Sequence, residues 1–98
     1  MLKVTVYTEP GLTRLLIEGR LVQDETAELT QVWLRAHEID PGARIEVDLS
    51  DLTYLDQAAQ ALLVTMCQQG VHLTGVGTMT RALIHQVSQT VAMQGVAT

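Results

Sequence analysis

Apolar and polar residues alternate at the start of the chain, as they do in a β-strand that buries one face. Leu2, Val4 and Val6 occupy every second position, and polar side chains separate them. A Glu-Pro-Gly turn at positions 9–11 leads into a second apolar run over residues 12–21. This arrangement predicts a β-hairpin.

The spacing of apolar residues becomes helical after position 24. Asp24 can cap a helix, and Glu25 and Glu28 would lie favourably near the positive end of its dipole. An Asp-Pro-Gly sequence at positions 40–42 ends the segment. The apolar residues that share one face of this predicted helix are Leu29, Val32, Trp33 and Ala36.

Alternation returns where Ile45, Val47 and Leu49 predict a further strand, and a short turn is expected between this strand and Asp56. Asp56 is the expected cap of the next helix, which is rich in small and apolar residues and ends at Gly70. This composition predicts a helix that is substantially buried. The residues expected on its inward face are Leu62 and Met66, together with Ala58 or Ala59.

The last predicted elements are a strand over residues 71–76 and a helix capped by Thr78 or Thr80. The pattern weakens from about residue 89, so no element is assigned to the tail. The apolar residues that share one face of this last helix are Leu83, Ile84 and Val87.

The order of elements, ββαβαβα, predicts a single α/β domain spanning residues 1–98, because a second domain would be too small to bury its own core. Strands that alternate with helices after a hairpin predict a mixed β-sheet with helices packed mainly on one face.

Charge and composition narrow the function classes. A net charge of -5 with only six Lys and Arg argues against nucleic acid, whose phosphates require clustered cations, and is more compatible with a basic protein partner. Cys67 is the only cysteine, so no internal disulfide can form and a reducing compartment is expected. The sequence has no run of 18 apolar residues, so no membrane span is predicted and a cytoplasmic protein is expected.

Candidate catalytic and metal-binding side chains do not form a pattern. Asp48, Asp51 and Asp56 lie in one strand-and-loop segment, but turn-forming and capping roles account for all three, so no metal site or cofactor is predicted. No nucleophile beside a base is identifiable, so the chain is not expected to be an enzyme. The histidines are scattered over two helices and a strand, at His37, His72 and His85.

The segment from position 48 to position 62 resembles the signature of STAS domains, the family of anti-sigma factor antagonists. In that signature an Asp-Leu-Ser strand end leads through an aromatic and an aliphatic residue to Asp-Ser-Ser/Thr-Gly-Leu. The resemblance extends over roughly residues 2–88 and implies the same ββαβαβα fold. The residues that fit the signature are Asp48, Leu49, Ser50, Leu52, Tyr54, Leu55 and Asp56.

This chain departs from the signature where switched family members carry their phosphate. Ala58 stands at the position of the phosphoacceptor hydroxyl, and a methyl group cannot be phosphorylated. Gln57, Ala59 and Gln60 replace the neighbouring Ser, Gly and Leu. Three hydroxyls remain nearby as alternative acceptors, although turn formation also accounts for them: Ser50, Thr53 and Tyr54.

The resemblance implies a non-catalytic protein-interaction module that binds a regulatory protein, such as an anti-sigma factor, through the start of the helix after Asp56. One alternative is an accessory subunit that docks on the ATPase of an ABC-type lipid transporter. A nucleotide- or small-ligand-binding STAS domain is a further alternative, although residues 75–77 lack the spacing of a phosphate loop. The predicted partner-binding residues are Thr53, Asp56, Gln57, Ala58, Ala59 and Gln60.

Overall fold

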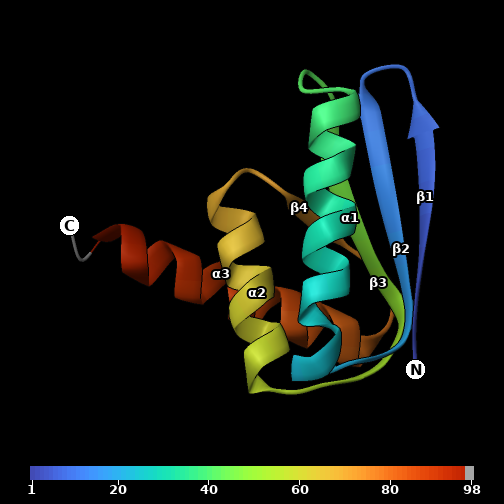
Figure 1. The fold of residues 1–98 in the computed structure, drawn as a ribbon. Coiled ribbons are helices and arrows are strands. Elements are labelled where there is room, and N and C mark those ends of the chain that lie inside the picture. The colour runs from blue at the N-terminus through green and yellow to red at the C-terminus, as the bar shows by residue number, and fades with distance from the viewer. Residues whose placement is uncertain (97–98) are drawn as a thin grey trace.

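The structure is a computed structural model that describes residues 1–96, with side chains through Met93. Figure 1 shows a β-sheet with helices packed beside it. The strands within residues 1–96 are β1 (Leu2–Glu9), β2 (Leu12–Leu21), β3 (Arg44–Leu55) and β4 (His72–Thr74). The α-helices of the same range are α1 (Thr26–Ile39), α2 (Gln57–Gln68) and α3 (Thr78–Val96). The predicted element order, ββαβαβα, is therefore confirmed.

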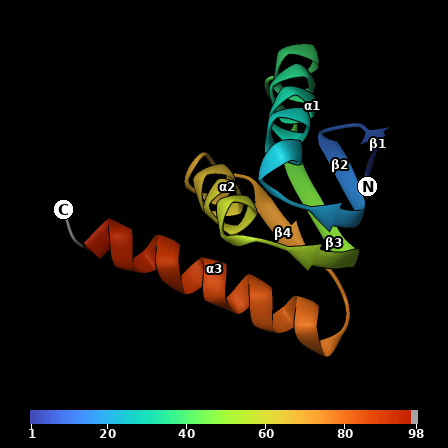
Figure 2. The ribbon, with the colours of Figure 1, turned by 60° about the horizontal axis from the view of Figure 1, so that its bottom comes forward.

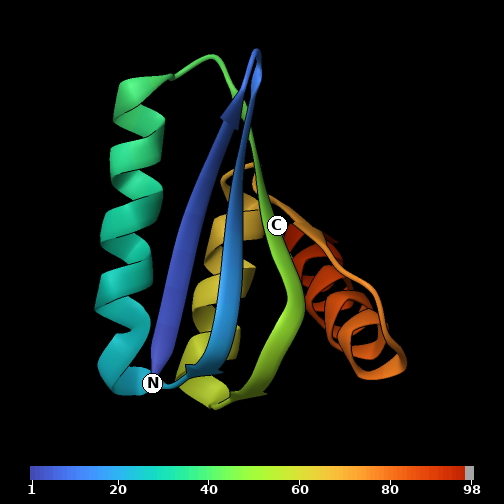
Figure 3. The same cartoon turned by 90° about the vertical axis from the view of Figure 1, so that its right-hand side faces the viewer.

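The sheet is mixed, as the sequence predicts. Its strand order is β1-β2-β3-β4, with β1 antiparallel to β2 and the other two pairs parallel. Helices α1 and α2 cover one face of this sheet (Figure 1). Helix α3 packs against α2 and runs past the β4 end of the sheet, which Figures 2 and 3 show from two further directions.

The hydrophobic core lies between the sheet and helices α1 and α2. Every second residue of β2, and of β3 as far as Leu49, points into it, and Leu15, Ile17 and Val47 have no exposed surface. The opposite face of the sheet is mostly polar, and there Arg14 and Glu46 approach within 3.5 Å. One apolar face and one polar face explain why the sequence alternates with a period of two.

Strand β3 is longer than the sequence predicts, because residues 51–55 continue the strand instead of forming a turn. These residues pair with the end of β2, where Gly19 lies beside Leu52 and Leu21 lies beside Leu55. Two register shifts in β2 accommodate this extension, and Gly19 adopts a positive φ of 92° between them. A partner strand therefore supplies the hydrogen bonds that the turn-forming residue types would otherwise make locally.

The prediction that Asp24 caps the first helix is wrong. Residues Gln23–Glu25 form a single 3₁₀ turn, and α1 begins after it at Thr26 with no side-chain cap. The turn satisfies its own backbone groups, because the Glu25 N–H donates to the Val22 carbonyl at 2.8 Å. The Gln23 N–H at the start of the turn donates to the carboxylate of Asp56 at 2.8 Å, so Asp56 accepts the kind of bond that the sequence assigned to Asp24.

The inward face of α2 differs from the prediction by a small rotation. Met66 and Ala59 are fully buried as predicted, and Ala58 is exposed. Leu62 is only half-buried against the core, whereas its neighbour Leu63 has no exposed surface. Leu63 therefore takes the central packing position that the sequence assigned to Leu62.

The C-terminal part is more helical and less extended than the sequence predicts. Strand β4 has three residues instead of six, and α3 continues through the weakly patterned tail to Val96. Val91 packs on the core and Met93 is exposed, while residues 97–98 lie outside the described part of the chain. No helix within residues 1–96 is both long enough and apolar enough to cross a membrane.

The packing of α2 predicts unequal costs for two adjacent truncations. Leu63→Ala should lower the free energy of unfolding by about 2–5 kcal/mol, because it leaves a cavity in the core. Leu62→Ala should cost clearly less, since part of its side chain already contacts water. Urea unfolding of both variants measures the difference, and equal costs would contradict this orientation of α2.

Candidate functional site

The start of α2 is organised by the carboxylate of Asp56, as the sequence predicts. Its backbone is extended, with φ of -99° and ψ of -176°, and Oδ1 accepts a hydrogen bond from the Ala59 N–H at 2.9 Å. This is the geometry of an N-cap residue. The cap fixes the residue at which the chain leaves β3 and begins the helix.

The second carboxylate oxygen of Asp56 makes a contact that the sequence does not predict. Oδ2 accepts a hydrogen bond from the Gln23 N–H at 2.8 Å, which ties α2 to the turn after β2. The backbone adds to this link, because the Asp56 N–H donates to the Leu21 carbonyl at 3.3 Å. Hydrogen bonds from Ala59 and then Gln23 lower the pKa of Asp56 below its ordinary value, because they stabilise the charged form.

The four residues after Asp56 divide between the surface and the core. Gln57 and Ala58 are exposed, and Gln60 is half-buried beside them. Ala59 is fully buried, so its side chain packs in the core beneath this surface and is not accessible to a partner. The predicted partner-binding residues are thus brought together, with Ala59 as the member that lies inside.

Thr53 lies close by on the extended end of β3. It is exposed, and its hydroxyl donates to the Gly19 carbonyl at 2.9 Å. Tyr54 follows it with about half of its surface exposed, and the guanidinium of Arg20 lies 5.2 Å from the centre of its ring. This cation–π contact joins residues that are also paired across β2 and β3.

A groove with a volume of about 420 Å³ runs beside the start of α2. The end of β3 forms one side of it, and the first two turns of α3 form another. None of the described side chains that line it carries a formal charge. Its lining residues are Leu49, Leu52, Thr53, Tyr54, Leu55, Gln60, Met79, Thr80, Ala82, Leu83 and Gln86.

Sequence reasoning missed the contribution of α3 to this surface. Met79 is 86% exposed at the start of the helix, and Leu83 lies one turn further along the same side. Their spacing of four residues is the signal that was available, since it extends the apolar face of α3 to its first turn. The sequence does not reveal that this turn lies opposite α2.

Ser50 has a structural role at the far side of the same groove. Its hydroxyl accepts a hydrogen bond from the Val76 N–H at 2.9 Å, and the carbonyl of the preceding Leu49 accepts one from the Thr80 hydroxyl at 3.4 Å. Gly75 is required here, because a Cβ at its position would lie 2.5 Å from Thr80 Cγ2. The glycines of residues 75–77 thus serve a tight strand-to-helix turn.

Two of the three candidate metal ligands of the sequence accept hydrogen bonds from backbone N–H groups. Asp48 Oδ1 accepts the Ser50 N–H at 2.9 Å, and both oxygens of Asp56 are used as described above. Among the described residues, no group of three or more acidic, histidine or cysteine side chains is placed to hold a metal ion. Cys67 is half-buried in α2, where burial raises the pKa of its thiol.

Comparison with known proteins identifies the fold. No protein-family model matches the sequence, and no curated protein matches it. The structure is similar to that of an anti-sigma factor antagonist from Mycobacterium paratuberculosis, with a TM-score of 0.73 and 19% identity over 91% of this chain and 80% of the other. It is also similar to the anti-sigma factor antagonist SpoIIAA in its unphosphorylated form, with a TM-score of 0.61 and 11% identity over 87% and 82% of the two chains.

A third similar structure is an uncharacterised protein with a SpoIIAA-like fold from Shewanella loihica, which has a TM-score of 0.55 and 13% identity over 80% of this chain and 69% of the other. The chain therefore has the SpoIIAA-like fold of STAS domains, and the resemblance noted in the sequence is confirmed at the level of fold.

The lowered pKa of Asp56 predicts a change in stability with pH. A carboxylate whose folded pKa lies below its ordinary value of 3.8 stabilises the fold above that pH, and this contribution is lost as the pH falls through the folded pKa. Asp56→Asn keeps a hydrogen-bond acceptor but has no charge to lose. As the pH is lowered, the free energy of unfolding measured in urea should therefore fall less for the variant than for the native chain. An equal fall in both proteins would contradict the stabilising role assigned to the Asp56 carboxylate.

Proposed function

We propose that this chain is a non-catalytic STAS-like interaction module that binds a regulatory protein, such as an anti-sigma factor, through the start of α2 and the groove beside it. The observation that carries the proposal is the exposed, uncharged helix start at Gln57 and Ala58, which adjoins a groove without charged lining. The similarity in fold to two anti-sigma factor antagonists supports the class of partner.

The chemistry of the groove suits a protein surface. Two side chains at its rim are exposed, Tyr54 over about half of its surface and Met79 over most of it. Both residue types are enriched in protein interfaces. Half-buried Leu52 and Leu83 line it between them. A partner that covers this area would remove apolar surface from water without having to desolvate a charge in the groove.

The proposed surface has no phosphoacceptor at its centre. Ala58 presents an exposed methyl group where the STAS resemblance implies a hydroxyl. The hydroxyl of Ser50 accepts a hydrogen bond from Val76, and the hydroxyl of Thr53 donates one to Gly19. The hydroxyls of Ser50 and Thr53 therefore have structural partners, which supports a docking surface that phosphorylation of these two residues does not switch.

A charge at position 58 tests the location of the docking surface. Ala58→Glu should weaken binding to the cognate anti-sigma factor about tenfold or more, because the carboxylate would lie against an uncharged interface. Ala58→Gln is the matched control, with nearly the same size and no charge, and should bind more tightly than the glutamate variant. Isothermal titration calorimetry measures both affinities.

The fold should survive this change. Position 58 is exposed in the first turn of α2, where a carboxylate interacts favourably with the helix dipole by about 0.3–1 kcal/mol. Thermal unfolding of both variants checks this point. If the Ala58→Glu variant and the native chain bind the anti-sigma factor equally well, the interface lies elsewhere. If the native chain binds a transporter ATPase and no anti-sigma factor, the partner belongs to the other class.

Restoring the hydroxyl tests the absence of a switch. Ala58→Ser should become phosphorylated by an anti-sigma kinase that recognises this surface, whereas the native chain should gain no phosphate under the same conditions. Intact-protein mass spectrometry followed by peptide mapping measures both. A phosphate on Ser50, Thr53 or Tyr54 of the native chain that altered binding would contradict an unswitched surface.

A further inference from the structure

Strand β1 is an open edge of the sheet. It pairs with β2 on one side and stands at the end of the strand order, with no described strand on its other side. Val6 and Tyr7, near its centre, are 46% and 50% exposed. An exposed eight-residue edge with apolar side chains is a template for pairing with another strand.

The hydrogen-bonding pattern shows which backbone groups of β1 are available. The Arg20 N–H donates to the Met1 carbonyl at 3.1 Å, so the backbone carbonyl of residue 1 points toward β2. Residues of an antiparallel strand alternate in the direction of their backbone groups. The N–H and C=O groups of the even-numbered residues therefore point to the open side. These residues are Leu2, Val4, Val6 and Thr8.

We propose that β1 pairs with β1 of a second copy of this chain, antiparallel, with Val6 on the twofold axis. Val6 would then form a hydrogen-bonded pair with its own symmetry mate, as the direction of its backbone groups requires. In the same register Lys3 of each copy lies opposite Glu9 of the other. This contact gives two opposite-charge pairs across a single strand pair.

Shifting the axis by one residue in either direction keeps the backbone bonds possible but removes the match of charges. An axis at Thr5 would place Lys3 opposite Tyr7, and an axis at Tyr7 would place Glu9 opposite Thr5. Only the register centred on Val6 pairs both charged residues of β1 with opposite charges. The sequence of the edge thus specifies its own partner and alignment.

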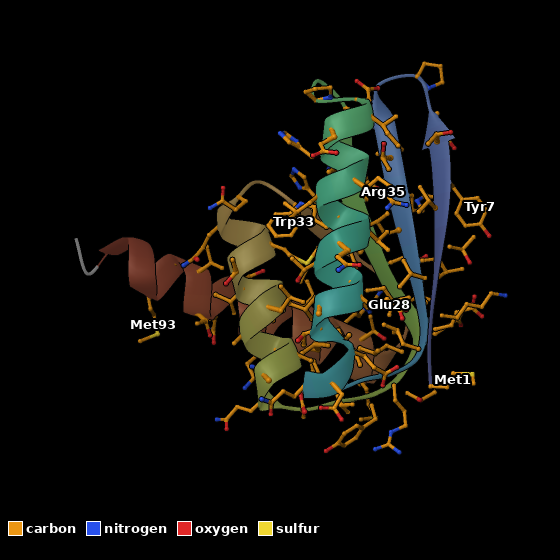
Figure 4. All side chains as sticks on the ribbon, viewed as in Figure 1. Met1, Tyr7, Glu28, Trp33, Arg35 and Met93 are labelled. Atoms are coloured by element: carbon orange, nitrogen blue, oxygen red, sulfur yellow. The ribbon has the colours of Figure 1, made fainter. Side chains whose placement is uncertain are left out.

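Helix α1 supplies a second complementary pair beside the edge. A groove of about 310 Å³ lies between α1 and β1, with Val6, Glu28 and Arg35 in its lining. Glu28 and Arg35 are both exposed and stand two turns apart on α1 (Figure 4). A twofold axis through Val6 relates the two grooves, so Glu28 of one copy lies toward Arg35 of the other.

A disulfide test reads the register directly. In Val6→Cys the introduced thiols of two copies would face each other, with Cα atoms about 5.5 Å apart, which permits a disulfide. Thr8→Cys is the matched control on the same side of β1, and its Cα atoms would lie about 14 Å apart. Mild oxidation followed by non-reducing electrophoresis should give a crosslinked dimer for the first variant only. Native Cys67 is present in both, so the native chain reports the background.

Charge reversal tests the same register without a covalent bond. Sedimentation velocity over a concentration series should show the native chain of 10.7 kDa in reversible exchange with a dimer. Lys3→Glu and Glu9→Lys should each raise the dissociation constant several-fold, and the double variant should restore it. A native chain that stays monomeric at all concentrations, equal crosslinking of the two cysteine variants, or a double variant no better than the single ones would each overturn the proposal.

Discussion

The carboxylate of Asp56 joins three parts of the chain, and the candidate site depends on that junction. It accepts a hydrogen bond from Ala59, which caps α2, and one from Gln23 in the turn after β2. The backbone N–H of Asp56 donates to the Leu21 carbonyl. The end of β2, the end of β3 and the start of α2 therefore meet at one residue. With the start of the helix fixed in this way, Ala58 faces outward and Ala59 faces the core.

The local signals in the sequence predict half of this junction. A cap followed by an apolar run is a property of neighbouring residues, so Asp56 and the start of α2 are predictable. The bond to Gln23 joins residues 33 positions apart, and nothing in either segment indicates that they meet. Residues 51–55 were mispredicted for a related reason, because Asp, Thr and Tyr after a strand are typical of a turn unless a second strand pairs with them.

The same distinction applies to packing. Apolar spacing gives the face of a helix to within one residue, and the choice between Leu62 and Leu63 depends on how α2 is rotated on the sheet. The α3 wall of the groove was beyond prediction, because it arises only when Met79 and Leu83 are brought to the end of β3. Element order and sheet type were predictable, since they follow from periodicity and short connections.

The two proposed interaction surfaces use different elements. The docking surface involves β3, α2 and α3, whereas self-association involves β1 and α1. A dimer formed through β1 would therefore leave both docking surfaces accessible and present them as a pair. Two sites on one particle raise the effective concentration for a partner that is itself dimeric.

The exposure of Ala58 also bears on how such a protein evolves. Alanine codons differ from serine and threonine codons at a single base, and the side chain at this position has room around it because it points into solvent. The fold therefore places no steric obstacle between this form and one that carries a hydroxyl. Under the proposed function, a single nucleotide change would therefore be enough to turn a permanent binder into a reversible one, and it would leave the architecture unchanged.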